Sequence, residues 1–212
     1  MKKIAIIGAG MIGATTARLF VDAGHEVAVS NSRGPATLAD LVKDLGPKAR
    51  AMTVADAARW GDLVLLAVPW RAPEALPPAD TVAGKIVVDA MNPYGPDGQV
   101  MNLEPSTSSE ETAKRLPGAR IVKAFNTIYY KHLASRGKKD APLDDRHAIF
   151  VASDDEAAKR DVMALIEEIG FGPVDTGSLA AGGRRQQPNT PLYNQAITRR
   201  EGLERLRVMT PA

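Results

Sequence analysis

The stretch Lys3-Ile-Ala-Ile-Ile7-Gly8-Ala-Gly-Met-Ile-Gly13 decides the fold of this 212-residue chain. Its first segment is almost wholly apolar, which is typical of a strand buried on both faces of a parallel sheet. The next six residues have the spacing G-x-G-x-x-G, and residues 11–23 read as a helix that Gly24 ends. The order of strand, glycine-rich turn and helix predicts the first half of a strand–helix–strand unit.

Each glycine of this turn has a physical role in such a unit. Gly8 permits the tight turn, Gly10 lets the backbone approach a pyrophosphate, and Gly13 lets the helix pack closely on the strand. The start of the helix offers free N–H groups and the positive end of its dipole to phosphates. The flanking strand and helix favour a dinucleotide site over a turn of small residues without a ligand. The predicted contacts are Gly8, Ala9, Gly10, Met11, Ile12 and Gly13.

Strands and helices alternate beyond this turn. Further strands are predicted at 26–30, 63–68, 85–90, 120–125, 148–152 and 173–175, and helices at 36–45, 106–116, 153–169 and 198–208. Thr53-Val-Ala-Asp56 and Ser153-Asp-Asp-Glu156 have the form of capping boxes that open helices, and 135–146 reads as an exposed loop. The alternation over the first ~125 residues predicts an α/β fold with a doubly wound, mostly parallel sheet.

The composition excludes several classes of protein. Hydrophobic residues make up 44% and charged residues 25%, as in an ordinary globular protein. No cysteine is present, which excludes disulfide scaffolds and thiolate chemistry, and the three histidines show no metal-ligand spacing. The first apolar run is far shorter than the ~20 residues of a membrane span. We therefore expect a cytoplasmic protein with no metal and no membrane partner.

The charge balance is uneven. The net charge is +2, but residues 183–212 carry six arginines against two glutamates. Such a basic tail can bind nucleic acid or an anionic ligand, or remain solvated. Because only Tyr193 interleaves with the arginines as an aromatic residue, we expect no nucleic-acid partner.

The end of the second predicted strand indicates which dinucleotide binds. An NAD site usually carries Asp or Glu here for the ribose 2′-hydroxyl. This chain has Ser30-Asn31-Ser32-Arg33 instead, with no carboxylate between Glu26 and Asp40. A guanidinium and hydroxyls favour a 2′-phosphate, so NADP(H) is predicted, with Asn31, Ser32 and Arg33 as its contacts. A solvated arginine and strand-end capping by the hydroxyls are the alternatives.

The other strand ends should hold the nicotinamide and its reaction partner, because ligands of such sheets bind beyond the carboxyl ends of the strands. The predicted contacts are Ala67, Val68, Pro69, Asn92, Pro93, Ala124 and Asn126. Trp70 either packs on a ring or covers the end of the sheet, and the asparagines could instead stabilise turns. No acid–base pair and no Tyr-x-x-x-Lys pattern stands out, so no catalytic residue is predicted. Hydride transfer to a flavin-like ring depends more on positioning than on such a residue.

Taken together, these motifs resemble the NADP oxidoreductase, coenzyme F420-dependent family. The resemblance rests on 8–13, Asn31-Ser32-Arg33, Val68-Pro69-Trp70, Met91-Asn92-Pro93, 122–127 and Asp175-Thr176-Gly177-Ser178-Leu179. It implies a Rossmann NADP-binding domain over 1–146 and a small C-terminal lobe over 147–212, generally in a homodimer. It also implies hydride transfer between NADPH and a small-molecule acceptor, either the deazaflavin coenzyme F420 or a flavin.

The chain departs from characterised deazaflavin reductases at Asn126, where they carry His, and along 182–194. Ferric or flavin reduction, reduction of a small imine or carbonyl, and a non-catalytic NADP(H)-binding sensor are the alternatives. Gly182-Gly183 predicts a flexible loop, from which Arg184 or Arg185 would bind an anionic acceptor.

Overall fold

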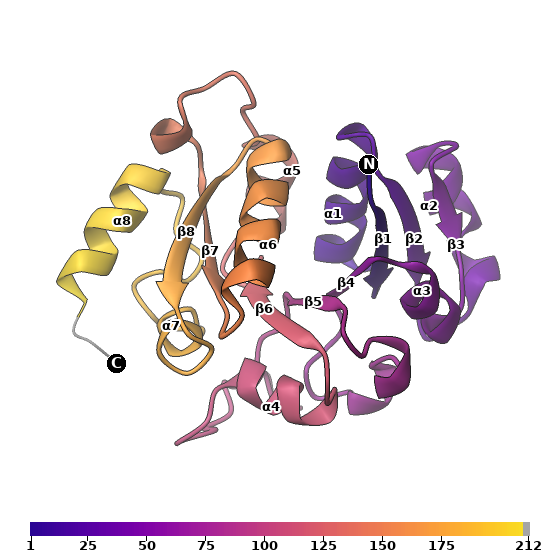
Figure 1. The fold of residues 1–212 in the computed structure, drawn as a ribbon, viewed down its shortest axis with the longest axis horizontal. Coiled ribbons are helices and arrows are strands. Elements are labelled where there is room, and N and C mark those ends of the chain that lie inside the picture. Colours follow the sequence, from indigo (N-terminus) through magenta and orange to yellow (C-terminus); the bar gives the residue numbers. More distant parts are fainter. Residues whose placement is uncertain (210–212) are drawn as a thin grey trace.

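The computed structural model describes residues 1–209 and contains one eight-stranded sheet (Figure 1). The strands are β1 (Lys3–Ile7), β2 (Glu26–Ser30), β3 (Ala49–Ala51), β4 (Leu63–Leu66), β5 (Ile86–Asp89), β6 (Arg120–Ala124), β7 (Ala148–Ala152) and β8 (Gly172–Gly177). Their order across the sheet is β3-β2-β1-β4-β5-β6-β7-β8. All neighbouring strands are parallel except β6 and β7, which are antiparallel. The predicted doubly wound α/β fold is confirmed.

Helices cover both faces of the sheet. They are α1 (Met11–Asp22), α2 (Ala39–Leu45), α3 (Val54–Trp60), α4 (Ser108–Arg115), α5 (Tyr130–Ser135), α6 (Glu156–Glu168), α7 (Ala181–Arg185) and α8 (Arg199–Val208). Four short 3₁₀ turns occur at Pro35–Leu38, Pro73–Ala75, Ala79–Thr81 and Leu143–Asp145. On one face, α1, α2, α5 and α6 bury Phe20, Leu45, Leu133 and Val162 in a single core. On the other face, α3 packs through Ala57 and Ala58, and α8 packs through Leu203 and Leu206.

The sheet extends past β6 without a break. The β7 strand pairs with the end of β6, with Lys123 opposite Ala152, and β8 then pairs with β7. Residues 147–209 thus add two strands to the same sheet, together with the helices α6, α7 and α8 (Figure 1). The boundary that we place at residue 146 stays a prediction.

Two local predictions need correction. The helix expected over 36–45 is divided into a 3₁₀ turn that begins at Pro35 and α2, because Leu38 leaves helical geometry with φ −108° and ψ 6°. The capping box expected at Ser153-Asp-Asp-Glu156 does not cap α6. The cap is Asp155, whose carboxylate accepts the N–H of Ala158, while the Ser153 hydroxyl donates to the Ile121 carbonyl.

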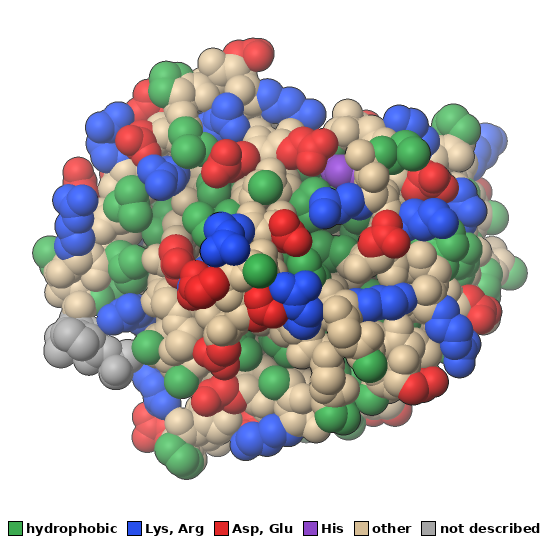
Figure 2. All heavy atoms as spheres, viewed as in Figure 1, with side chains coloured by type: hydrophobic (Ala, Val, Ile, Leu, Met, Phe, Trp, Pro, Cys, Tyr) green, Lys and Arg blue, Asp and Glu red, His purple; other side chains and the backbone are tan. Residues whose placement is uncertain are grey.

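Charged side chains of both signs are interspersed over the face seen in Figure 2. Within residues 1–209, no helix combines the length and the apolar character that crossing a membrane requires.

Candidate active site

Two glycines of the 8–13 turn are required by the packing of β1, β4 and α1. Gly8 has φ +104°, and a Cβ there would lie 2.4 Å from the carbonyl oxygen of Ala67. A Cβ on Gly13 would lie 1.8 Å from the carbonyl oxygen of Gly8. Neither distance is possible, so both positions need glycine for the chain to fold, with or without a ligand.

Gly10 differs from both, because a Cβ there would meet no atom of the described residues within 4 Å. Gly10 is the N-cap of α1, and no side chain of residues 1–209 caps this helix. Among the described helices of eight residues or more, α4, α6 and α8 are capped by Thr107, Asp155 and Thr198. The start of α1 thus keeps unpaired N–H groups beside open space, as a pyrophosphate requires.

The residues predicted to bind a 2′-phosphate lie together after β2. The side chain of Asn31 accepts a hydrogen bond from the backbone N–H of Arg33 (3.0 Å) and donates to the hydroxyl of Thr37 (2.9 Å). Ser32 and Arg33 are exposed, and the Arg33 guanidinium has no hydrogen bond or ion pair within residues 1–209. Ser30 instead is buried and donates to the Ile6 carbonyl, so its hydroxyl is structural. Thr37 is a member of this group that sequence reasoning missed.

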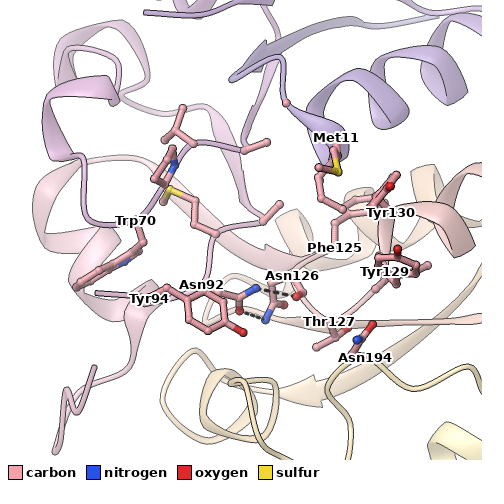
Figure 3. Close-up of a pocket in the computed structure, with 18 of the residues that line it drawn as sticks. Met11, Trp70, Asn92, Tyr94, Phe125, Asn126, Thr127, Tyr129, Tyr130 and Asn194 are labelled. Carbon is pink, nitrogen blue, oxygen red and sulfur yellow. Dashed lines mark hydrogen bonds between the residues drawn. The ribbon is translucent and has the colours of Figure 1, made fainter. Parts of the chain in front are cut away.

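A cavity of about 560 Å³ lies where β1, β4, β5 and β6 end (Figure 3). Eight of the predicted contacts line it: Gly10, Met11, Ile12, Ala67, Val68, Pro69, Asn92 and Asn126. Pro93 and Ala124 are buried next to it but do not line it, and Gly8, Ala9 and Gly13 lie in the turn behind Gly10. Asn31, Ser32 and Arg33 do not line the cavity, as expected if a long dinucleotide connects the two places.

Two asparagine side chains on the cavity wall bind each other (Figure 3). The amide of Asn92 donates to the backbone carbonyl of Asn126 (2.9 Å), and the amide of Asn126 donates to the Asn92 side-chain oxygen (3.1 Å) and to the Gln186 carbonyl (2.8 Å). Among the described residues, the Oδ1 atom of Asn126 has no partner. The pair joins the loop after β5 to the loop after β6.

A buried ion pair supports this wall from behind. Asp89 accepts the backbone N–H of Met91 (2.9 Å), and the Lys123 ammonium donates to the Met91 carbonyl. Lys123 Nζ and Asp89 Oδ2 are 3.5 Å apart, and both side chains are fully buried. Burial lowers the pKa of Lys123, and the Asp89 carboxylate opposes this shift. The backbone N–H and the carbonyl of Met91 are therefore both held by hydrogen bonds, one residue before Asn92.

Trp70 serves mainly to cover the end of the sheet. It is buried, its indole N–H donates to the Ser108 carbonyl (3.1 Å), and the Arg115 guanidinium lies 4.4 Å from its ring centroid. Part of the Trp70 side chain also lines the cavity.

The rest of the cavity wall is rich in tyrosine, which sequence reasoning missed. Tyr94, Tyr129, Tyr130 and Tyr193 line it together with Arg71 and Asn194. Among the described residues, no carboxylate and no histidine lines this cavity. The site can therefore orient flat rings and donate hydrogen bonds, but it offers no carboxylate or imidazole base.

The expectation of a flexible loop at Gly182-Gly183 is wrong. Both glycines are buried in α7, where a Cβ on Gly182 would lie 2.6 Å from the Thr176 hydroxyl. Arg184 pairs with Glu104 (3.2 Å), and Arg185 donates to the Thr176 carbonyl (3.0 Å). Neither guanidinium lines the cavity, whereas Arg71 does.

Comparisons with known proteins bear on this geometry. Residues 3–93 match the family described as NADP oxidoreductase, coenzyme F420-dependent. A proposed F420-dependent NADP reductase from Arthrobacter sp. FB24 is 30% identical, with a TM-score of 0.74, and the match covers 94% of this chain and all of that one. The chain belongs to this family. The hypothetical protein SMa0349 from Sinorhizobium meliloti is 36% identical, with a TM-score of 0.81 over 93% of this chain and 96% of that one.

The rat metalloreductase STEAP3 is 30% identical over 180 residues, which are 84% of this chain and 34% of that protein. This chain thus spans about a third of the length of that curated relative. Members of the F420-dependent NADP oxidoreductase family are NADP-dependent oxidoreductases, and the family supports NADP(H) as the dinucleotide of this chain.

Proposed function

We propose that this protein transfers a hydride between NADPH and a deazaflavin or flavin-like acceptor. The observation that carries the proposal is one cavity that runs from the uncapped start of α1 at Gly10 to a wall of tyrosines. A dinucleotide lying on α1 would place its nicotinamide in this cavity, and the tyrosine side leaves room for a second ring. Such a site brings a donor and an acceptor together without a protein nucleophile.

Different residues would bind the different parts of the dinucleotide. The N–H groups at Gly10, Met11 and Ile12 would hold the pyrophosphate. Asn31, Ser32 and Arg33 would hold the 2′-phosphate, since the unpaired guanidinium of Arg33 offers a planar fork of donors. Bound nicotinamide supplies the hydride.

The nicotinamide end would meet residues that four strands bring together. Ala67, Val68 and Pro69 would pack against the ring and its ribose, while Asn92 and Asn126 would receive the carboxamide. Asparagine side chains carry both the donors and the acceptor that match that group. Gly8, Ala9, Gly13, Pro93 and Ala124 would shape the backbone that carries these contacts.

The acceptor class follows from the wall opposite the nicotinamide. Tyr129 and Tyr130 offer aromatic faces for a flat ring system, and Arg71 offers a positive charge for an anionic tail. F420 and flavin nucleotides share a flat ring and an anionic tail. In the family's own description F420 is the coenzyme, and this too supports the proposal.

The test follows NADPH oxidation by its nicotinamide absorbance under anaerobic conditions, with F420, FMN or riboflavin as the acceptor. We expect NADPH to be consumed in a one-to-one ratio with at least one of them, and the Gly10→Val variant to be inactive. If calorimetry shows tight NADPH binding but no member of the three is reduced, the acceptor class is wrong. If NADPH does not bind, the whole proposal fails.

A further inference from the structure

Two tyrosine hydroxyls meet at the edge of the cavity. Tyr94 follows β5 and Tyr193 precedes α8, so 99 residues separate them in the sequence. Their hydroxyl oxygens lie 3.1 Å apart, both side chains are half-buried, and both line the cavity. Figure 3 shows the Tyr94 ring beside Asn92, on the side of the cavity away from Tyr129 and Tyr130.

The backbone holds this pair firmly. The N–H of Tyr94 donates to the carbonyl of Asn92 (2.8 Å), and the N–H of Asn194 donates to the carbonyl of Thr127 (2.8 Å). Tyr94 is therefore linked directly to Asn92, and Tyr193 is linked through the next residue, Asn194, to the neighbour of Asn126. The hydroxyl pair and the asparagine pair are two cross-links in the same cavity wall.

Hydrogen-bond counting leaves one proton unused. Two hydroxyls carry two protons, and the bond between Tyr94 and Tyr193 uses one of them. Within residues 1–209, neither hydroxyl has another hydrogen-bond partner. Burial and the hydrogen bond with Tyr94 raise the pKa of Tyr193. The pair thus presents one unused hydroxyl proton at the cavity edge.

We propose that the Tyr94–Tyr193 hydroxyl pair recognises the acceptor by donating a hydrogen bond to a ring carbonyl oxygen. The inference rests on the proposed function and names its acceptor-specificity residues. Flavins and deazaflavins carry two carbonyls on the ring portion that accepts electrons. Charge arriving with a hydride spreads onto these oxygens, so a donor there holds the reduced ring more strongly than the oxidised ring.

The experiment measures binding as well as turnover. Riboflavin and 5-deazariboflavin are titrated into the protein saturated with NADP⁺, and the dissociation constants of the wild type and the Tyr94→Phe, Tyr193→Phe double variant are compared. Phenazine methosulfate, a tricyclic hydride acceptor without a carbonyl, is the control ligand. Each single variant keeps one hydroxyl, so we expect a smaller effect from it. Melting temperatures and NADP⁺ affinity check that each variant is folded.

The expected result is a roughly tenfold loss of affinity for both carbonyl-bearing rings in the double variant, from one lost hydrogen bond. Affinities for phenazine methosulfate and NADP⁺ should stay within about twofold. Equal affinity of wild type and double variant for the flavins overturns the inference and leaves the proposed function intact. An equal loss for phenazine methosulfate also overturns it, because the tyrosines then act by shape. A wild type that binds NADP⁺ but neither flavin overturns the proposed function, and the inference with it.

Discussion

Replacing Gly10 and Gly13 in parallel separates ligand binding from folding within four residues. The Gly10→Val change adds a side chain where nothing lies within 4 Å, on extended backbone with φ −79° and ψ −165°. The folded state loses only the preference of an N-cap for glycine over valine, roughly 1 kcal/mol or less. For a chain of this size, we expect the melting temperature to change by no more than about 4 °C.

Binding should respond very differently. The new methyl groups would fill the space that brings phosphate oxygens to the N–H groups of α1. Losing two hydrogen bonds to charged oxygens, at roughly 1.5–3 kcal/mol each, weakens binding by ~3–6 kcal/mol. This corresponds to about 10²–10⁴ in Kd. Isothermal calorimetry with NADPH on the folded variant measures it directly.

The matched variant is Gly13→Ala. Its Cβ would lie 1.8 Å from the Gly8 carbonyl oxygen, so the turn must open. We expect a loss of about 3 kcal/mol or more, and a melting temperature lower by at least about 6 °C. A Gly10→Val protein that melts normally and binds NADPH within threefold of wild type would refute the assignment of this turn to the pyrophosphate.

Three further predictions concern other parts of the chain. Arg33→Ala should raise the Kd of NADPH roughly 10–100-fold and leave that of NADH unchanged in parallel titrations, whereas an equal loss for both would exclude a 2′-phosphate contact. Lys85→Met should lower the melting temperature by about 3–12 °C, because the Lys85 ammonium donates to three carbonyl oxygens at the end of α3 at 2.7–2.9 Å. An unchanged melting temperature would show that water replaces these hydrogen bonds. Burial, Arg136 and His132 lower the pKa of His147 from 6.5 to about 4. Between these pH values only the unfolded chain binds the proton, so the stability of the folded protein should fall as the pH drops from about 6.5 to 4. The urea midpoint of His147→Gln should fall less than that of the wild type over this range, and an equal fall for both proteins would contradict the prediction.

The sequence predicts the fold well where buried strands are continuous apolar runs. β1, β4 and β7 are such runs, and their burial on both faces is what a sheet covered by helices on both sides requires. Prediction was weaker where structure depends on one side chain. Asp155 rather than Ser153 caps α6, because Asp155 can reach the N–H of Ala158 while the Ser153 hydroxyl is taken by the Ile121 carbonyl.

For the site, the strand ends that line the cavity could be predicted, and the tyrosines that line it could not. Met11, Pro69 and Asn92 line the cavity and lie shortly after predicted strands, where the topology of the sheet places ligands, and their contacts with a dinucleotide stay predictions. Tyr94 and Tyr193 come from irregular segments 99 residues apart, and no local sequence pattern predicts that their hydroxyls are in contact. The one available signal was position, since Tyr94 lies two residues after Asn92. Gly182-Gly183 misled the prediction because these glycines serve close packing against Thr176 rather than flexibility.

The reversal of direction between β6 and β7 has a consequence for how such an enzyme can diversify. The turns after the parallel strands β1, β4, β5 and β6 line the cavity, and several of their residues also belong to the central core. Tyr193 and Asn194 arrive instead from a segment beyond the last strand, tied to the wall by the Asn194–Thr127 backbone bond and the Tyr94 hydroxyl. Under the proposed function, we expect substitutions at Tyr193 and Asn194 to affect the acceptor more than NADPH. Related proteins would then keep NADPH and differ in the molecule that they reduce.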